Sequence, residues 1–145
     1  RPFLEESAIT AEAATESEVC NFPRNVLDRL VKRTPELGLT LHRQALKELD
    51  EARDWMLTLG RKTAEEKVAS FLYLIATHID PECVDMSTFD LPLSRADIAD
   101  FLGLTIETVS RQFTKLRKEN VIRIENNRRV TVPDMDRLMR HAGND

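Results

Sequence analysis

The chain has 145 residues, of which 41% are hydrophobic and 32% are charged, and its formal net charge is −4. This length and composition indicate a globular protein with one domain or two small modules. No apolar run approaches the roughly 20 residues that cross a bilayer, and no charged-then-apolar leader opens the chain, so we expect a cytoplasmic protein without a membrane partner. Because the first residue is Arg1 rather than a methionine, we expect a fragment or processed product of a longer protein.

Positive charge is concentrated in one part of this acidic chain. Between Thr105 and Thr131 seven basic residues stand against three acidic ones, a pattern typical of a nucleic-acid contact. The two cysteines, Cys20 and Cys83, are too far apart for a CxxC metal motif and too few for a disulfide framework. The three histidines are scattered and no glycine-rich phosphate loop is present, so we expect no metal site in this fragment and no enzymatic activity.

The first 22 residues show two short alternating stretches. Residues 8–14 and 18–22 alternate apolar and polar side chains around Thr15, Glu16 and Ser17, which predicts a β-hairpin. An isolated hairpin is marginally stable in water. We therefore interpret residues 1–22 as the last strands of a larger sheet that lies upstream.

Residues 23–60 are expected to be helical and to form a second module. Pro23 suits the first turn of a short helix that ends near Lys32, and Thr34 followed by Pro35 opens a long helix. Apolar residues recur there at alternating spacings of four and three, which is the seam of a coiled coil. The seam consists of Leu41, Ala45, Leu49, Ala52, Met56 and Leu59. It would pack on a second copy of the chain or, in the alternative, on the core of its own domain.

Residues 61–145 are expected to form the third module. Gly60 interrupts the long helix, and residues 63–66 form a capping box that opens the next helix. A polar loop over residues 80–88 leads to an edge strand over residues 89–93, because the internal Pro92 cannot donate to a central ladder. A second capping box, residues 94–97, then starts another helix.

The stretch from Ser94 to Glu119 has the pattern of a helix-turn-helix. Apolar residues keep helical spacing on both sides of Gly103, while small Ala99 permits a close helix crossing and Val109 packs between the helices. The other face of the second helix would be exposed. It carries three polar side chains near its N-terminal end that suit contacts with base edges in a major groove: Glu107, Ser110 and Arg111.

A hairpin is predicted directly after this helix. Val121 to Ile124 and Val130 to Val132 alternate around a polar turn, which is the arrangement of a winged helix. Arg128 and Arg129 at the turn would lie beside the phosphate backbone, although a solvated turn would carry the same two arginines. Residues 134–141 are expected to form a short amphipathic helix.

Three segments resemble the Crp-Fnr family of bacterial transcription regulators, most closely its Fnr and FixK branch: GRKTAEEKVASFLYLIA, LPLSRADIADFLGLTIETVSRQFTKLRKENVI and the basic wing. The similarity covers essentially the whole chain, and LTIETVSRQF is its most specific part. It implies a mainly α fold with little β structure, in which a dimerisation helix precedes a winged helix-turn-helix domain. The remnant strands before it would belong to a sensory β-barrel of cyclic-nucleotide type, most of which this chain lacks.

The resemblance also implies roles for individual residues. Glu107, Ser110 and Arg111 match the E-x-x-S-R pattern that contacts a TTGAT half-site, and Ser94 and Arg95 match a pair that holds DNA phosphates. The expected partners are double-stranded DNA, a second copy of the chain and RNA polymerase, with a role in oxygen- or redox-linked gene control.

Three positions limit or extend this resemblance. Gln112 stands where the family has an apolar residue, and Ala52 stands where Fnr regulators have an acidic residue in the dimer seam. Cys20 matches the fourth ligand of a [4Fe-4S] cluster, which would form only in the full-length protein; a small core residue is the other interpretation. The rival functional class is a helical dimerisation or partner-binding module whose winged helix contacts protein.

Overall fold

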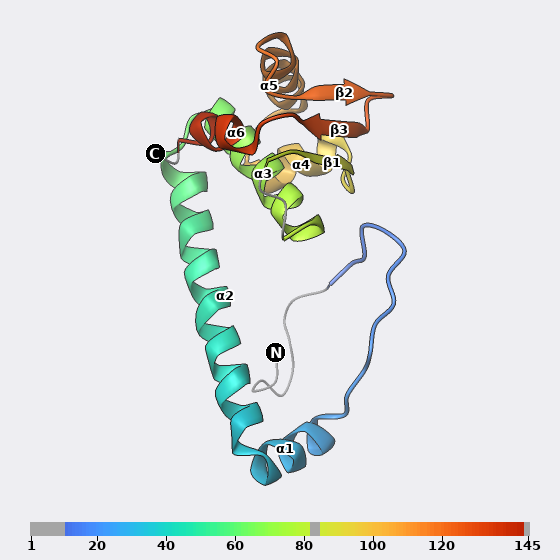
Figure 1. The fold of residues 1–145 in the computed structure, drawn as a ribbon, viewed down its shortest axis with the longest axis vertical. Helices are drawn as coiled ribbons and strands as arrows, with labels where there is room; N and C mark the ends of the chain where they lie inside the picture. The colour runs from blue at the N-terminus through green and yellow to red at the C-terminus, as the bar shows by residue number, and fades with distance from the viewer. Residues whose placement is uncertain (1–10, 82–84, 144–145) are drawn as a thin grey trace. The chain divides into compact units, whose positions relative to one another are not determined.

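The computed structural model describes residues 11–81 and 85–143, and the chain divides into two compact units, residues 1–54 and 55–145 (Figure 1). The fold is mainly helical with one small sheet, as predicted. In chain order the elements are α1 (Arg24–Arg33), α2 (Pro35–Arg61), α3 (Ala64–Ile79), β1 (Ser87–Asp90), α4 (Arg95–Leu102), α5 (Ile106–Lys118), β2 (Arg123–Glu125), β3 (Arg129–Val132) and α6 (Met135–His141).

The hairpin predicted near the N-terminus is not formed. Residues 11–22 contain no strand and are all exposed, so the prediction is wrong for these residues; residues 8–10 lie outside the described part. The alternating pattern alone could not create strands, because each strand needs a paired neighbour and a buried face.

Both helices of the first unit begin as predicted. α1 follows Pro23, whose carbonyl accepts hydrogen bonds from the amides of Val26 and Leu27, and α2 has Pro35 as its first residue. The predicted interruption at Gly60 is present within one residue, since α2 ends at Arg61 and α3 begins at Ala64. Among the helices of the described residues, none is long and apolar enough to cross a membrane.

Each helix of the second unit begins at a residue whose own side chain accepts a hydrogen bond from the first turn. Both predicted capping boxes are present, with Glu66 and Asp97 returning a hydrogen bond to the cap backbone. Such a cap contributes roughly 1 kcal/mol and fixes where a helix starts. The capping residues of α3, α4, α5 and α6 are Thr63, Ser94, Thr105 and Asp134.

The sheet of the second unit is antiparallel with the order β1-β3-β2. The predicted wing hairpin is therefore confirmed as β2 and β3. The predicted edge strand also exists, but it is four residues long and begins at Ser87, before the predicted start. It stops ahead of Pro92, which has no amide hydrogen for a ladder. The hydrogen bonding between β1 and β3 continues one residue past the end of β1, since the Leu91 amide donates to the Arg128 carbonyl at 2.9 Å.

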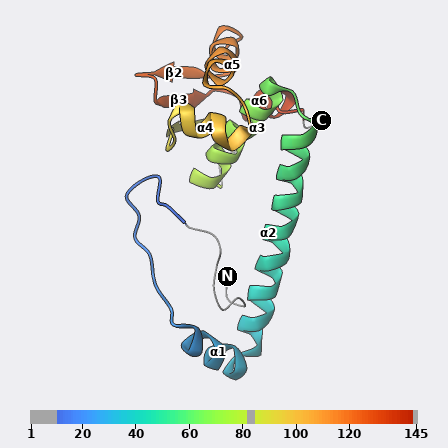
Figure 2. The same cartoon turned by 180° about the vertical axis from the view of Figure 1, so that it is seen from behind.

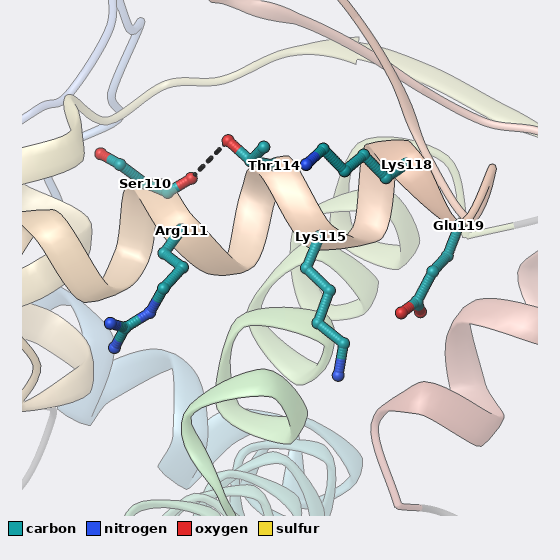
Figure 3. A pocket seen from close by; sticks show the side chains of 6 residues that line it. All are labelled: Ser110, Arg111, Thr114, Lys115, Lys118 and Glu119. Atoms are coloured by element: carbon teal, nitrogen blue, oxygen red, sulfur yellow. Dashed lines mark hydrogen bonds between the residues drawn. The ribbon is translucent and has the colours of Figure 1, made fainter.

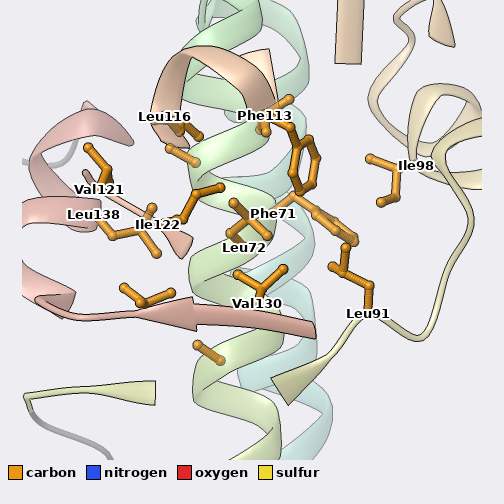
Figure 4. Packing of buried hydrophobic residues seen from close by; sticks show 14 of the residues in the cluster. Phe71, Leu72, Leu91, Ile98, Phe113, Leu116, Val121, Ile122, Val130 and Leu138 are labelled. Atoms are coloured by element: carbon orange, nitrogen blue, oxygen red, sulfur yellow. The ribbon is translucent and has the colours of Figure 1, made fainter. Parts of the chain in front are cut away.

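A hydrophobic core unites the elements of the second unit. α3 contacts α5, α6 and β1, and α4 packs on α5 (Figures 1 and 2). Figure 4 shows that side chains from helices and sheet meet around α3. The largest fully buried residues include Phe71, Leu72, Ile98, Leu102, Leu116, Ile122 and Leu138. This core holds α5 so that its outer face stays exposed.

Candidate nucleic-acid interface

The predicted helix-turn-helix is present and consists of α4, a short turn and α5. Gly103 ends α4 with φ of +62°, a left-handed conformation that costs glycine little. The Leu104 amide then donates to the Ala99 carbonyl at 2.9 Å, which closes the turn. Ala99 and Val109 are buried between the helices, as predicted. The two helices are therefore held by buried contacts rather than by their exposed faces.

α5 presents the three predicted base-contacting residues to solvent. Glu107, Ser110 and Arg111 are all exposed, whereas Val109, Phe113 and Leu116 of the same helix are buried. The Glu107 pKa is lowered, first by a hydrogen bond from its own backbone amide and then by one from the Thr105 side chain, so this carboxylate is ionised at neutral pH.

The guanidinium of Arg111 has one weak contact within α5. Its Nη2 donates to Thr108 Oγ1 at 3.5 Å, and Thr108 is also hydrogen-bonded to Thr105. A bond of this length is at the limit for a hydrogen bond and leaves the remaining donors of the guanidinium unused. Among the described residues, Arg111 therefore keeps most of its N–H donors available.

One cation of α5, Lys115, is held by an ion pair. Figure 3 shows Arg111 and Lys115 extending from one side of the helix, while the Thr114 hydroxyl donates to the Ser110 carbonyl at 2.9 Å. The Lys115 ammonium forms an ion pair with Glu65 of α3, whose other oxygen lies 3.1 Å from His141 Nδ1. Lys115 is thereby held toward the body of the unit.

The partner of Lys115 was not found from the sequence. Of the predicted capping box over residues 63–66, Glu66 is the residue that bonds back to the Thr63 backbone. Glu65 instead joins α3 to α5 and α6, and the hydrogen bond from Lys115, followed by that from His141, lowers its pKa. Periodicity could not reveal this link, because the partners lie 50 and 76 residues away.

Ser94 and Arg95, the two residues predicted to hold phosphates, lie at the start of α4. They differ in how far their side chains are already engaged within the chain. The Ser94 hydroxyl donates to Asp97 Oδ2 at 2.6 Å and accepts from the Asp97 amide at 3.2 Å, so the cap already uses it. Arg95 is half-buried, with its Cζ 3.6 Å from the centre of the Phe113 ring. Burial lowers the Arg95 pKa from its ordinary value, and arginine nevertheless remains charged at neutral pH.

Arg128 and Arg129, the two wing residues predicted to lie beside the phosphate backbone, differ in their side-chain contacts. Asn126 and Asn127 form the turn between β2 and β3 with positive φ angles of 50° and 58°, as a tight hairpin requires. Arg128 is turned toward the sheet, where its Nε donates to the Leu91 carbonyl at 3.3 Å. Arg129 is exposed on β3. Arg129 is thus the wing arginine with the freer side chain.

Most of the predicted dimer seam is exposed within the single chain. The exposed fraction is 45% for Leu49 and 69% for Met56, and Ala45 and Ala52 are also exposed. Leu41 is half-buried, and Leu59 packs against the core of the second unit. Leu59 therefore has a partner inside the chain, whereas the middle of the seam has none among the described residues.

Neither a metal nor an iron-sulfur centre is supported by the described residues. Glu65, Glu119 and His141 lie within 4.8 Å of one another, but Lys115 already neutralises Glu65. Cys20 is an exposed free thiol, and Cys83 lies outside the described residues. A [4Fe-4S] cluster needs four thiolates. The residues of this chain therefore do not fit that group, and the interpretation of Cys20 as a buried core residue is wrong.

Comparison with known proteins agrees with this geometry. Residues 66–141 match the family model described as the Crp-like helix-turn-helix domain, which covers α4, α5 and the wing. The chain belongs to the Crp-Fnr family. The part that matches is the compact second unit, in which the exposed face of α5 lies.

Two bacterial relatives are similar over nearly the whole chain. A protein of Rhizobium leguminosarum bv. viciae named "Probable transcriptional activator" is 70% identical over 97% of this chain and 58% of its own length. The transcriptional activator protein FnrL of Cereibacter sphaeroides is 45% identical over 100% of this chain and 60% of its own length. The chain thus spans about three fifths of these relatives.

A solved structure of the same family has a similar fold. FixK2 from Bradyrhizobium japonicum superimposes with a TM-score of 0.69 at 36% sequence identity. The match covers 81% of this chain and 57% of the FixK2 chain.

Proposed function

We propose that this Crp-Fnr chain is a dimeric, sequence-specific DNA-binding unit of a transcription regulator and not an enzyme. The observation that carries the proposal is the division of α5, whose Val109, Phe113 and Leu116 are buried while Glu107 and Arg111 are exposed. A helix held in this way can enter a major groove without disturbing the core that supports it. The transcriptional activators among the relatives support the same function.

Base recognition is assigned to the exposed face of α5. Arg111 donates to O6 and N7 of a guanine, and Glu107 accepts from the amino group of a cytosine or adenine. Ser110 precedes Arg111 in the chain and is likewise exposed. The proposed target is a palindrome of TTGAT-like half-sites, on the strength of the E-x-x-S-R pattern.

Phosphate contacts are assigned to residues around this face. Arg95 and Arg129 have free donors, and Arg128 keeps its terminal nitrogens available although its Nε is bound to Leu91. Ser94 is assigned with them and acts by holding the start of α4, because its hydroxyl and its amide both donate to Asp97 Oδ2. These contacts fix orientation and carry no sequence information.

The seam along α2 is proposed as the dimer contact. Two copies would place their recognition helices about 34 Å apart, one turn of B-DNA. Within this scheme residues 1–22 belong to the sensory part, residues 23–60 form the linker and dimerisation helices, and residues 61–145 bind DNA. RNA polymerase is the proposed further partner.

Oxygen- or redox-linked control is the proposed role of the regulator as a whole. Its support is the resemblance to the Fnr and FixK branch, in which Cys20 has the position of one cluster ligand. This chain has two cysteines, so a [4Fe-4S] cluster would need thiolates from a longer protein.

The test is a competition titration at fixed salt with Arg111→Ala. Removal of the bidentate guanine contact should cost about 1 to 3 kcal/mol on the TTGAT-like palindrome and relax the preference at one base pair. Arg140→Ala is the matched control, because Arg140 is an exposed arginine of α6. An equal decrease on the palindrome and on a scrambled duplex would exclude α5 as the base-contacting element. No binding to either duplex would favour the rival class, a module that contacts protein.

A further inference from the structure

A cavity of about 290 Å³ opens on the second unit where the start of α4, the middle of α5 and the wing meet. Three elements distant in sequence contribute to it: α4 through Arg95, α5 through Phe113, Thr114 and Arg117, and the wing turn through Asn127. It lies on the opposite flank of α5 from the Lys115 ion pair, and none of the sequence patterns indicated it.

The charged groups that line this cavity are both positive. Arg95 and Arg117 supply two guanidinium groups, and no carboxylate lines the cavity. Within residues 11–81 and 85–143 neither arginine has a carboxylate within 4.0 Å. Two like charges that share a hollow without a counter-ion favour the binding of an anion.

Arg95 is held in the cavity by an aromatic ring. Its Cζ lies 3.6 Å from the centre of the Phe113 ring, within the range of a cation–π contact. Phe113 is only 2% exposed, so the core fixes the ring and the ring fixes the guanidinium. Stacking engages the flat face of arginine and leaves its in-plane N–H donors free.

The remaining polar groups of the cavity suit the same kind of ligand. Arg117 is four residues after Phe113, so both side chains project from the same face of α5. Asn127 brings a side-chain amide from the wing, at a left-handed position of φ 58°. Guanidinium and amide N–H groups are the donors that bind phosphate oxygens in protein–DNA complexes.

We propose that this cavity binds one phosphate of the DNA backbone, with Arg95 and Arg117 as paired ligands, Asn127 as a donor from the wing and Phe113 as the residue that positions Arg95. The proposal rests on the proposed function and adds Arg117, Asn127 and Phe113 to it. It also gives the wing a contact that does not depend on Arg128.

The first experiment measures the salt dependence of duplex binding for Arg117→Ala. Affinity should fall by about tenfold for the palindrome and for a scrambled duplex alike, because the variant lacks one charge-assisted hydrogen bond to phosphate while base preference is untouched. The slope of log K against log salt should flatten by about 0.9 for each phosphate that the variant no longer neutralises. Arg140→Ala, which removes an equal charge from α6, should leave the slope unchanged.

The second experiment tests Phe113 as a positioning residue. Phe113→Leu should flatten the salt slope as Arg95→Ala does, whereas Phe113→Tyr, which keeps a ring, should restore it. Binding is measured at a temperature at which urea unfolding curves show that each variant is folded in the absence of urea. A Phe113→Leu variant that is less stable but has the wild-type slope would overturn the positioning role.

Two outcomes separate this proposal from the proposed function. If Arg117→Ala keeps the wild-type slope while Arg111→Ala still relaxes base preference, the cavity is not a phosphate site and α5 remains the base-contacting helix. If inorganic phosphate raises the melting temperature of wild type but not of Arg117→Ala, while the duplex slope is unchanged, the cavity binds a free anion and the DNA assignment is wrong.

Discussion

The two compact units differ in the distance over which their side chains interact. Among the described residues before Trp55, the ion pairs join residues three or four positions apart within one helix, as Lys47 and Glu51 do. From Trp55 onward, contacts cross the sequence: Lys115 pairs with Glu65, and the Ser70 hydroxyl donates to the Ala142 carbonyl at 3.5 Å. Local pairs stabilise a helix, whereas distant pairs stabilise a fold.

Burial follows the same division. The buried hydrophobic residues among those described all lie in the second unit, and α1 buries none of its side chains. A helix with an exposed apolar stripe gains little stability by itself. The second unit therefore has the core of an independently folding domain, and the first unit needs an apolar partner, which we propose is a second copy of α2.

The largest predicted effect tests that partner. Leu49→Glu should give monomers and reduce affinity for the palindrome by about 10² to 10⁴, because the second half-site is then no longer bound by a linked copy. Leu46→Glu is the matched control, since Leu46 is 50% exposed and Leu49 is 45% exposed on the same helix but only Leu49 lies in the seam. Sedimentation at micromolar concentration checks the assembly, and a Leu49→Glu dimer would contradict the seam.

The next effect concerns the core. Leu116→Ala should lower the free energy of unfolding of the second unit by about 2 to 5 kcal/mol, because truncation of a fully buried leucine leaves a cavity beneath α5. Urea unfolding measures the decrease. Leu57→Ala is the control, since that side chain is 55% exposed and its truncation should change stability by less than about 0.5 kcal/mol. Equal decreases for both variants would remove the distinction between core and surface.

The smallest effect concerns a distant polar contact and depends on pH. The Glu65 pKa is lowered by Lys115 and His141, so its ion pairs stabilise the fold above the ordinary value of 4.5 and lose this contribution as the pH falls through the lowered pKa. Glu65→Gln should cost up to about 1 kcal/mol at pH 7, since the Lys115 side chain is 48% exposed and water screens the pair.

The measurement for Glu65 is urea unfolding of wild type and Glu65→Gln over a range of pH. The difference between them should be constant well above pH 4.5 and should disappear as the pH falls through the lowered pKa. Glu51→Gln is the control, because its pair with Lys47 is local to α2 and exposed. A difference for Glu65→Gln that grows toward low pH would reverse the sign and refute the assignment.

Sequence reasoning succeeded where structure is encoded locally. Capping boxes at Thr63 and Ser94, the left-handed Gly103 and the apolar spacing of α5 are read within a few residues, and all are present. The strands expected before residue 22 failed, because a period of two needs a neighbouring strand. The expected break at Gly60 is present, since α2 ends one residue later, at Arg61.

The candidate site divides in the same way. The exposure of Glu107, Ser110 and Arg111 follows from helical periodicity once Val109 and Phe113 are buried. The turn of Arg128 toward Leu91 was not predicted, since the hydrogen bond of a single side chain depends on coordinates. The cavity of Arg95 and Arg117 brings together residues 22 apart in sequence with a wing turn, and no periodic pattern describes such a meeting.

The cap at Thr105 has a consequence for how this protein can change over evolution. The cap fixes the start of α5, and Val109 and Leu116 fix its rotation, so folding does not depend on the three exposed residues between them. If the proposed base contacts hold, substitutions at Glu107, Ser110 or Arg111 alter the preferred operator at little stability cost, because exposed positions tolerate exchange. Duplicated copies of such a gene could diverge to control separate sets of promoters on one unchanged scaffold.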